Sequence, residues 1–347
     1  LASTEPQIDD INLWVDTVNT RISLLRYLEG NFNQATLNRG GREVIGFICD
    51  PEQTLLKIVD KVADVHIALT HFKEPLQHRK GLCLTFNNIA MSDNDLEVVC
   101  DIVETNDTCK ALCFRQNLIS AQGAIRLAKA LKKNKSITSL ELDYNKIKDE
   151  GLAALAEAVY YHRNLEVLSL AGNQIGDAGC TALMTAMMDS QKKTGEPHRM
   201  KHLQLSNNLI GDPGAKALAR MIRKNETVEM LSLSCNNLTD KGVGYILEVA
   251  DRHALPIKSL LLARNQLSSK TLIALAEYLT KVDREVEIDL GENKLITGKG
   301  VQAILAAGVP IEIQDFRIVK KDKHAALEPE LVEESAAAAA EPSPAEH

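Results

Sequence analysis

The stretch Leu140-Glu-Leu-Asp-Tyr-Asn145 decides the fold, because it recurs along the chain at a nearly constant interval. Related hexapeptides end at other asparagines, and the full set is Asn87, Asn117, Asn145, Asn173, Asn208, Asn236, Asn265 and Asn293. Successive asparagines are separated by 28 to 30 residues, apart from one interval of 35. A repeat of this period indicates stacked structural units rather than one globular core.

Each copy contains a strand and a helix. Leu140 and Leu142 alternate with Glu141 and Asp143, which is the two-residue period of a strand with one buried face. After the asparagine the chain shows apolar residues at helical spacing. The residue four positions after the asparagine suits a helix N-cap, and the predicted caps are Asp149, Asp177, Asp212, Asp240, Ser269 and Thr297.

Two further residue types recur at fixed places. Glycines two positions after the cap positions predict that each helix lies close to its neighbour, and they are Gly123, Gly151, Gly179, Gly214 and Gly242. The repeated asparagines are predicted to hydrogen-bond the backbone where the chain leaves each strand. We interpret them as a structural ladder and not as ligands of a functional site.

Stacking explains how such units bury their leucines. Neighbouring strands pair in parallel, the helices form an outer layer, and the leucines lie between the two layers. Helices need about 10 Å of width and strands about 4.8 Å, so the stack must curve with its strands on the concave side.

The consensus L-x-x-L-x-L-x-x-N-x-I/L-x-x-x-G-x-x-A-L covers about residues 80–315. It resembles the ribonuclease-inhibitor type of leucine-rich repeat, which also occurs in NOD-like receptors and Ran GTPase-activating proteins. The resemblance implies an α/β leucine-rich-repeat solenoid shaped as a horseshoe, with parallel strands on the concave face and helices on the convex face. It implies protein binding, the one activity that members of this family share.

The chain divides into three segments. Residues 1–79 show helical spacing over 6–30 and 51–74, which predicts an N-terminal helical cap over the first repeat or a small helical module with its own partner. Residues 80–317 hold about eight repeats and a closing strand at 310–313. Residues 318–347 form a Glu/Ala/Pro-rich tail whose composition predicts disorder. The tail suits a solubilising role, or a secretion or docking signal.

Charge and composition limit the classes of function. The formal net charge is −7, and the six glutamates between His324 and His347 account for most of it. The rest of the chain therefore lacks the basic footprint expected for nucleic-acid binding, and no apolar run is long enough to span a bilayer. Seven cysteines without scaffold-like spacing suit a reducing compartment and predict a cytoplasmic protein. An effector delivered to a host cytosol and an organelle protein with a removed leader both stay open.

The sequence lacks the common catalytic and metal-binding patterns. It contains no His-Glu-x-x-His, Cys-x-x-Cys or Gly-x-Ser-x-Gly motif, so we expect no catalytic residue, cofactor or metal ion. His66 and His71 are five apart on a predicted helix and therefore lie on different faces. Cys83 and Cys113 occupy outward positions on neighbouring predicted strands, where they form either two inert thiols or a redox-linked pair.

The alternation within the strands identifies the residues of the concave face. The acidic pairs Glu141/Asp143 and Glu287/Asp289 suit a partner protein with positive patches. The candidate partner-binding residues are Arg115, Glu141, Asp143, Tyr144, His202, Gln204, Met230, Leu261, Arg264, Glu287 and Asp289. The 35-residue interval predicts a loop over Asp189–Arg199, which is either a tolerated insertion or a contact loop.

Together these features predict a protein–protein interaction scaffold, monomeric by itself, that binds its partner through the concave face and is not an enzyme. One alternative is a GTPase-activating protein of the Ran-regulator type, in which Arg115, near a strand end, stabilises transition-state charge. Another is a secreted bacterial effector that binds a host protein, which the Glu-rich C-terminal tail weakly resembles.

Overall fold

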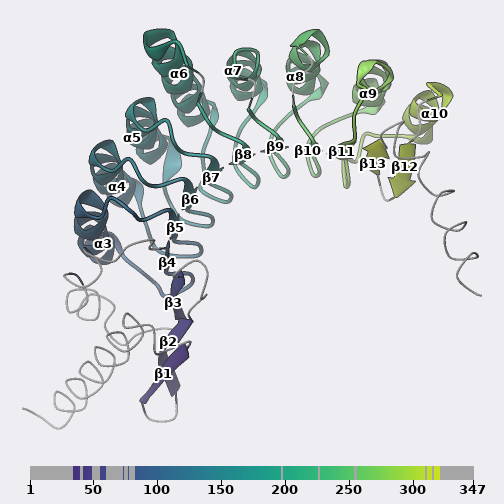
Figure 1. The fold of residues 1–347 in the computed structure, drawn as a ribbon. Coiled ribbons are helices and arrows are strands. Elements are labelled where there is room, and N and C mark those ends of the chain that lie inside the picture. Colours follow the sequence, from purple (N-terminus) through teal and green to yellow (C-terminus); the bar gives the residue numbers. More distant parts are fainter. Residues whose placement is uncertain are drawn as a thin grey trace, which may run out of the picture.

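The computed structural model describes residues 83–320, apart from 197, 226, 254–255, 309–310 and 315, together with strands at 34–39, 42–48 and 55–59 and residues 73 and 77. The helix predicted over 6–30 and the tail beyond residue 320 lie outside these described residues. Figure 1 shows an open arc, with the strands along its inner side and the helices along its outer side. The predicted horseshoe is confirmed.

The inner layer is a sheet in which strands β3 to β11 pair in parallel and in chain order. Most strands are short because each consists of one inward leucine between two outward residues. Their bounds are β3 (Leu55–Val59), β4 (Cys83–Thr85), β5 (Ala111–Cys113), β6 (Ser139–Glu141), β7 (Val167–Ser169), β8 (His202–Gln204), β9 (Met230–Ser232), β10 (Ser259–Leu261) and β11 (Val286–Asp289).

The outer layer consists of helices that alternate with the strands and lie side by side on the convex side (Figure 1). Each helix turns its apolar stripe toward the sheet, as the helical spacing of leucines and alanines predicts. Their bounds are α3 (Asp93–Thr105), α4 (Ala121–Lys133), α5 (Lys148–Tyr161), α6 (Asp177–Thr194), α7 (Asp212–Ile222), α8 (Asp240–His253), α9 (Ser269–Lys281) and α10 (Gly298–Ala306).

One continuous apolar core lies between the two layers. The central residue of every strand from β4 to β11 is at most 3% exposed, and these residues are Leu84, Leu112, Leu140, Leu168, Leu203, Leu231, Leu260 and Ile288. In the first repeats Phe86 and Phe114 stack with ring centroids 5.8 Å apart. Because each repeat buries its leucines against the next repeat, the array is stable only as a stack.

The predicted asparagine ladder is confirmed except at Asn87, which lies in register with Arg115 instead of Asn117 and whose Oδ1 accepts from Arg115 N at 2.9 Å. Nδ2 of Asn208 donates to Leu170 O in the preceding repeat (2.9 Å) and to Leu205 O in its own (3.0 Å). Its Oδ1 accepts from Ile175 N at 3.0 Å. The same donation to the preceding repeat is made by Asn117, Asn145, Asn173, Asn236, Asn265 and Asn293.

The N-cap prediction is wrong at every position except Thr297. The helices begin one or two residues earlier than predicted, so the aspartates lie inside the first turn. There each carboxylate bonds the next repeat instead of its own helix. Asp177 Oδ1 accepts from Gly211 N and Gly214 N, both at 2.8 Å, and Asp212 accepts from Thr239 N and its hydroxyl. Thr297 is the N-cap of α10 but makes no side-chain capping bond.

The predicted close approach of the helices at the small residues is confirmed. A Cβ on Gly179 would lie 2.6 Å from Asp149 Oδ1 and 3.0 Å from Asp149 Cα. A Cβ on Gly214 would lie 2.8 Å from Asp177 Oδ1. The glycines and the linking aspartates are therefore two halves of one contact between successive repeats.

The helix predicted over 51–74 is wrong at Leu55–Val59, which is strand β3. Strand β3 pairs in parallel with β4, and β1 (Gln34–Arg39) and β2 (Arg42–Ile48) add an antiparallel hairpin beyond it. Short apolar runs fit both the helical and the strand period. Here the unpaired edge of β4 offers backbone hydrogen bonds that favour the strand.

The predicted closing strand is also corrected. Strand β12 (Ile311–Gln314) does not pair with β11; β13 (Arg317–Lys320) pairs with β11, antiparallel, and β12 pairs with β13. A hairpin therefore closes the sheet. The Lys320 Nζ donates to Leu279 O at 2.7 Å and to Val282 O, carbonyls at the end of α9 that lack helical partners.

The loop predicted over Asp189–Arg199 is largely helix. The additional residues of the 35-residue repeat lengthen α6, which continues to Thr194 and ends at Gly195 in the left-handed conformation (φ 75°). Glycine accepts that conformation without the Cβ clash of other residues. Helix α6 therefore has 18 residues and extends beyond its neighbours in Figure 1.

Candidate binding face and comparisons with known proteins

The concave face consists of three rows of outward residues that cross the strands. The strand register gives a first row of Cys83, Ala111, Ser139, Val167, His202, Met230, Ser259 and Glu287. A second row contains Thr85, Cys113, Glu141, Ser169, Gln204, Ser232, Leu261 and Asp289. Backbone hydrogen bonds beyond the strand ends continue the ladder into a third row of Asn87, Arg115, Asp143, Ala171, Ser206, Ser234, Ala263 and Gly291.

Most of the predicted binding residues therefore belong to these rows. Tyr144 and Arg264 are the exceptions, because each follows the third row by one residue at the rim of the face. Both have positive φ, 56° for Tyr144 and 54° for Arg264. In the repeat that follows Tyr144, the same position is occupied by Gly172 (φ 66°). The Tyr144 ring packs over Gly172, where a Cβ would lie 2.6 Å from its Cδ1.

The N-terminal part of the face is an ion-pair cluster around Arg115. Its Nη2 lies 2.7 Å from Glu141 Oε2, and its Nε lies 3.2 Å from Asp143 Oδ2. The other oxygen of Asp143 accepts from Ser169 Oγ at 2.5 Å and from Ala171 N at 2.8 Å. Asp143 is only 6% exposed, so its carboxylate is fully engaged within the protein.

The centre of the face, on β7 to β9, carries no Asp, Glu, Lys or Arg side chain in the three rows. His202 is exposed, and Gln204 and Met230 are half-buried beside it. Ser206 Oγ lies 2.6 Å from Ser232 Oγ, and Gln204 Oε1 accepts from Ser206 N at 3.1 Å. This region offers hydroxyl, amide and thioether groups on a rigid sheet.

The acidic groups at the C-terminal part are paired within the protein. Arg317 of β13 forms an ion pair with Glu287, and Arg264 Nη2 lies 2.5 Å from Glu292 Oε1. Asp289 Oδ1 accepts from Gly291 N at 2.9 Å. The sequence pattern located these acids correctly but gave no sign of the cations that partly neutralise them.

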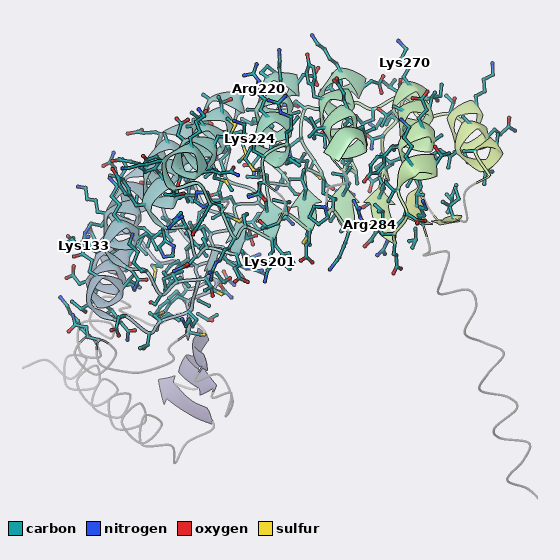
Figure 2. The ribbon with its side chains drawn as sticks, turned by 45° about the horizontal axis from the view of Figure 1, so that its top comes forward. Lys133, Lys201, Arg220, Lys224, Lys270 and Arg284 are labelled. Atoms are coloured by element: carbon teal, nitrogen blue, oxygen red, sulfur yellow. The ribbon has the colours of Figure 1, made fainter. Side chains whose placement is uncertain are left out.

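A row of alternating charges borders the face where the chain enters the strands. Lys201 Nζ lies 2.8 Å from Glu166 Oε2, and Lys258 Nζ lies 2.7 Å from Glu229 Oε2. Lys201 is labelled on the inner side of the arc in Figure 2. The hydrogen bond to Glu166 raises the pKa of Lys201, and the bond from Lys258 lowers the pKa of Glu229. Sequence reasoning missed this row because it lies outside the leucine alternation.

Cys83 and Cys113 are not placed opposite each other. Cys83 pairs with Ala111, and Cys113 pairs with Thr85, so the two cysteines are offset by two residues across neighbouring strands. Among the described cysteines no disulfide joins them. Burial, with Glu141 nearby, raises the pKa of Cys113 to about 12, which keeps it a thiol. Of the two alternatives, the register favours two separate thiols over a redox-linked pair.

Two histidines that the sequence did not single out lie buried where helices α5 and α6 connect to their next strands. His162 is 3% exposed and His198 is 1% exposed. Within the described part of the chain, neither ring nitrogen of either residue has a hydrogen-bond partner. Burial lowers the pKa of each to about 4, with Lys135 contributing at His162 and Arg163 contributing at His198.

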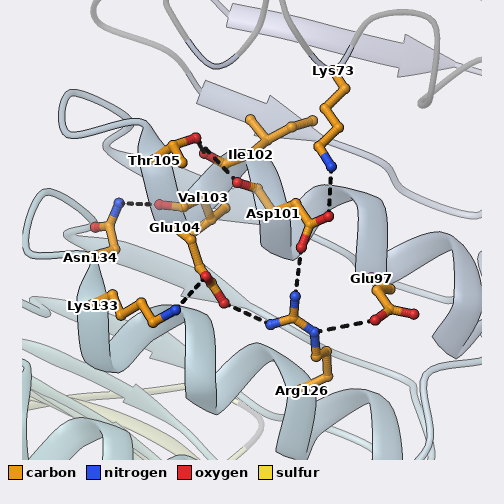
Figure 3. Close-up of polar contacts among 10 residues, drawn as sticks. All are labelled: Lys73, Glu97, Asp101, Ile102, Val103, Glu104, Thr105, Arg126, Lys133 and Asn134. Carbon is orange, nitrogen blue, oxygen red and sulfur yellow. Dashed lines mark hydrogen bonds and ion pairs between the residues drawn. The ribbon is translucent and has the colours of Figure 1, made fainter.

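A polar network braces the first helices on the convex side (Figure 3). Arg126 of α4 lies 2.6 Å from Asp101 and 2.8 Å from Glu104, both on α3. Lys73 reaches Asp101 at 2.7 Å, and Lys133 reaches Glu104 at 2.7 Å. Hydrogen bonds from Lys133 and Arg126 lower the pKa of Glu104. Because its acids are paired with cations, we interpret the network as structural.

Over the described ranges no group of three or more His, Cys, Asp or Glu side chains is arranged to hold a metal ion. No described helix combines the length and apolarity that crossing a bilayer requires.

Comparisons with known proteins identify the repeats. Four stretches match the family model described as Leucine Rich repeat, at residues 133–156, 161–184, 198–219 and 224–247. A solved structure of leiomodin-1 actin-binding site 2 matches with 18% identity over 53% of this chain and 89% of that chain, at a TM-score of 0.34. No curated protein matches the chain. The matched repeats fall on consecutive strand–helix units, so residues 133–247 contain leucine-rich repeats and the described part of the chain folds as a leucine-rich-repeat solenoid.

Proposed function

We propose that this protein is a non-enzymatic scaffold that holds a partner protein on the concave face of its repeat array. Leucine-rich repeats generally mediate protein–protein interaction. The observation that supports the concave face is its continuity, because the three rows run without a break from β4 to β11 and present one rigid curved surface. Such a surface contacts a partner at many points at once.

The acids on either side of the centre are paired within the protein, which favours the centre of the face as the main contact with the partner. Glu141, Asp143 and Glu287 are paired with arginines, so their attraction for a positive partner is reduced. Gln204 and Met230 carry no charge, and His202 forms no ion pair with a described residue. Interface cores are depleted in charge and enriched in methionine and aromatic residues. The partner therefore meets a mostly uncharged centre, with ion pairs on either side that set orientation.

A GTPase-activating function of the Ran-regulator type gains no support from the site. The guanidinium of Arg115 is held by Glu141 and Asp143 at 2.7 and 3.2 Å. An arginine that stabilises transition-state charge must offer its donors to the phosphate. Here both carboxylates would first have to release them.

The proposal is tested by capturing partners with the full chain and with a concave-face variant. The variant combines His202→Glu, Gln204→Glu and Met230→Glu, which places three carboxylates at the uncharged centre. We expect recovery of the partner proteins, quantified by mass spectrometry, to fall by roughly tenfold or more, because substitutions at the centre of an interface commonly cost over 1.4 kcal/mol.

The matched control introduces the same three charges on exposed helix positions, as Ala153→Glu, Thr185→Glu and Ile273→Glu. It should retain the partners, and both proteins should show unchanged far-UV circular dichroism. Recovery that is unaffected by the concave variant, or reduced equally by the control, contradicts binding through the concave face.

A further inference from the structure

A groove on the convex side, between α7 and α8, combines an apolar floor with cationic walls. It has a volume of about 270 Å³, and its floor includes Ala219, Val249 and the ring of Tyr245. The lining cations are Lys216, Arg220 and Arg223, with Glu248 as the one lining carboxylate. Figure 2 labels Arg220 and the neighbouring Lys224 on the helix side of the arc.

Over the described residues, no ion pair involves Lys216, Arg220 or Arg223, and the Lys216 Nζ lies 5.4 Å from the Tyr245 ring centroid. Arg126 of α4, by contrast, meets three carboxylates on α3. The groove therefore carries an excess of positive charge in a protein whose formal net charge is −7.

The chain itself contains a segment with the complementary chemistry. Residues 327–334 read Leu-Glu-Pro-Glu-Leu-Val-Glu-Glu, which places Leu331 and Val332 between glutamates. From His324 to His347 there is no lysine or arginine. Pro329 favours an extended backbone before it, which suits a peptide laid along a groove. We propose that this C-terminal segment docks in the α7–α8 groove of the same molecule, its leucine and valine on the apolar floor and its glutamates against Arg220 and Arg223.

The segment is long enough to reach. Strand β13 ends at Lys320, whose amine bonds Leu279 O at the end of α9. Helices α7, α8 and α9 are neighbours, so at 8–10 Å between helix axes the groove lies about 15 Å along the arc from α9. The eight residues from 321 to 328 span up to about 29 Å when extended.

Tethering makes such a contact effective although each ion pair is weak. Exposed pairs contribute little individually, and a free peptide of this kind would bind weakly. A short covalent tether raises the effective concentration of the attached segment to about the millimolar range. Salt should weaken the contact, because exposed charges are screened.

The test uses the full chain with a photoreactive benzoylphenylalanine in place of Leu331, or in place of Ala338 as the control position. Irradiation followed by peptide mass spectrometry should place cross-links from position 331 on Tyr245, Val249 or Ala219, and none there from position 338. A mixture of ¹⁵N-labelled and unlabelled protein reports whether the cross-link joins two molecules. Cross-links between molecules, or links scattered away from α7 and α8, overturn the proposal.

Charge exchange provides the second arm. Arg220→Glu with Arg223→Glu should reduce the groove cross-link by roughly tenfold, because two attractions become repulsions. Adding Glu330→Arg and Glu333→Arg should restore it, which also shows that the groove variant is folded. Lys129→Glu with Lys270→Glu, two exposed helix cations elsewhere, should leave it unchanged. A groove cross-link that survives Arg220→Glu and Arg223→Glu contradicts docking by charge.

Discussion

His162 occupies a position that asparagine fills in other repeats. Asn134 stands three residues before Ile137, just as His162 stands three residues before Leu165. The Asn134 Nδ2 donates to Val103 O at 2.8 Å, and its Oδ1 accepts from Ile137 N at 3.1 Å. An imidazole at this place fills the same buried space without making these bonds. A histidine that is buried in this way resists protonation.

We expect the stability of the protein to fall as the pH decreases from about 6.5 to about 4. The folded-state pKa of His162 and His198 is lowered to about 4, so in this window the unfolded chain binds protons that the folded chain does not. Stability is then fully present above pH 6.5 and declines by roughly 3 kcal/mol per histidine at pH 4. Urea unfolding between pH 4 and 8 measures this decline.

The variant His162→Asn separates this effect from general acid sensitivity. It should remove about half of the histidine-dependent decline and raise stability at pH 5, because asparagine can make the bonds that Asn134 makes. A pH profile of His162→Asn that superimposes on that of the parent protein would show that the buried imidazole does not cause the decline.

The ladder asparagines supply a second prediction. Asn208→Ala removes the acceptor for Ile175 N and the donor to Leu170 O, both buried. We expect a loss of about 3 kcal/mol in the free energy of unfolding, because buried backbone groups are left without partners. The control is Asn237→Ala at an exposed position, which should change stability by less than about 0.5 kcal/mol. Equal effects of the two variants would contradict the ladder as a stabilising element.

At the scale of elements, helix spacing depends on the glycine and aspartate contact between repeats. Helix α8 offers an internal comparison. A Cβ on Gly242 would lie 2.4 Å from Asp212 Oδ1 and 3.3 Å from the Cβ of Ala215, whereas a Cβ on Gly244 would have no atom within 4 Å. Both positions belong to the same helix, so intrinsic helix propensity is nearly the same at each.

We therefore expect opposite effects from two alanine substitutions. Gly242→Ala should destabilise the protein by about 1–3 kcal/mol, because α7 and α8 must separate. Gly244→Ala should stabilise it by about 0.5–1 kcal/mol through reduced chain entropy. Thermal unfolding followed by circular dichroism measures both, and stabilisation by Gly242→Ala would show that the helices are not in close contact there.

The elements were predictable to different degrees. The leucine period predicted strands β4 to β11, the helices between them and the side of the sheet that each strand residue faces, because these depend only on local spacing. The extension of α6 was misjudged, although Gly195 is a recognisable helix C-cap. The assignment of the aspartates as caps failed because their partners, such as Thr239 for Asp212, belong to the next repeat.

The same limit applies to the candidate site. The alternation of leucines placed Glu141, His202 and Met230 on the concave face, as the strand register bears out. The pairing of Arg115 with Glu141 and Asp143 depends on the reach of side chains across neighbouring strands. The spacing of residues within one repeat does not show which side chains of neighbouring strands touch. The pairing of these acids with Arg115 is therefore visible only in the assembled sheet.

In the whole molecule the parallel sheet is open, so both of its edge strands need a pairing partner. An antiparallel hairpin lies at each edge: β1–β2 lies beyond β3, and β12–β13 lies beyond β11. They cover the edges of the parallel sheet that would otherwise pair with other chains. The concave face between them stays accessible, while the convex groove between α7 and α8 offers a separate surface.

Oxidative footprinting of the complex with a captured partner shows which face of the array the partner covers. Hydroxyl radicals modify exposed methionine, histidine and tyrosine side chains, and mass spectrometry locates each modification. On partner binding through the concave face, we expect oxidation of Met230 and His202 to slow several-fold while that of Tyr161, 52% exposed on α5, is unchanged. Protection of Tyr161 with unchanged oxidation of Met230 and His202 would show that the partner does not bind the concave face.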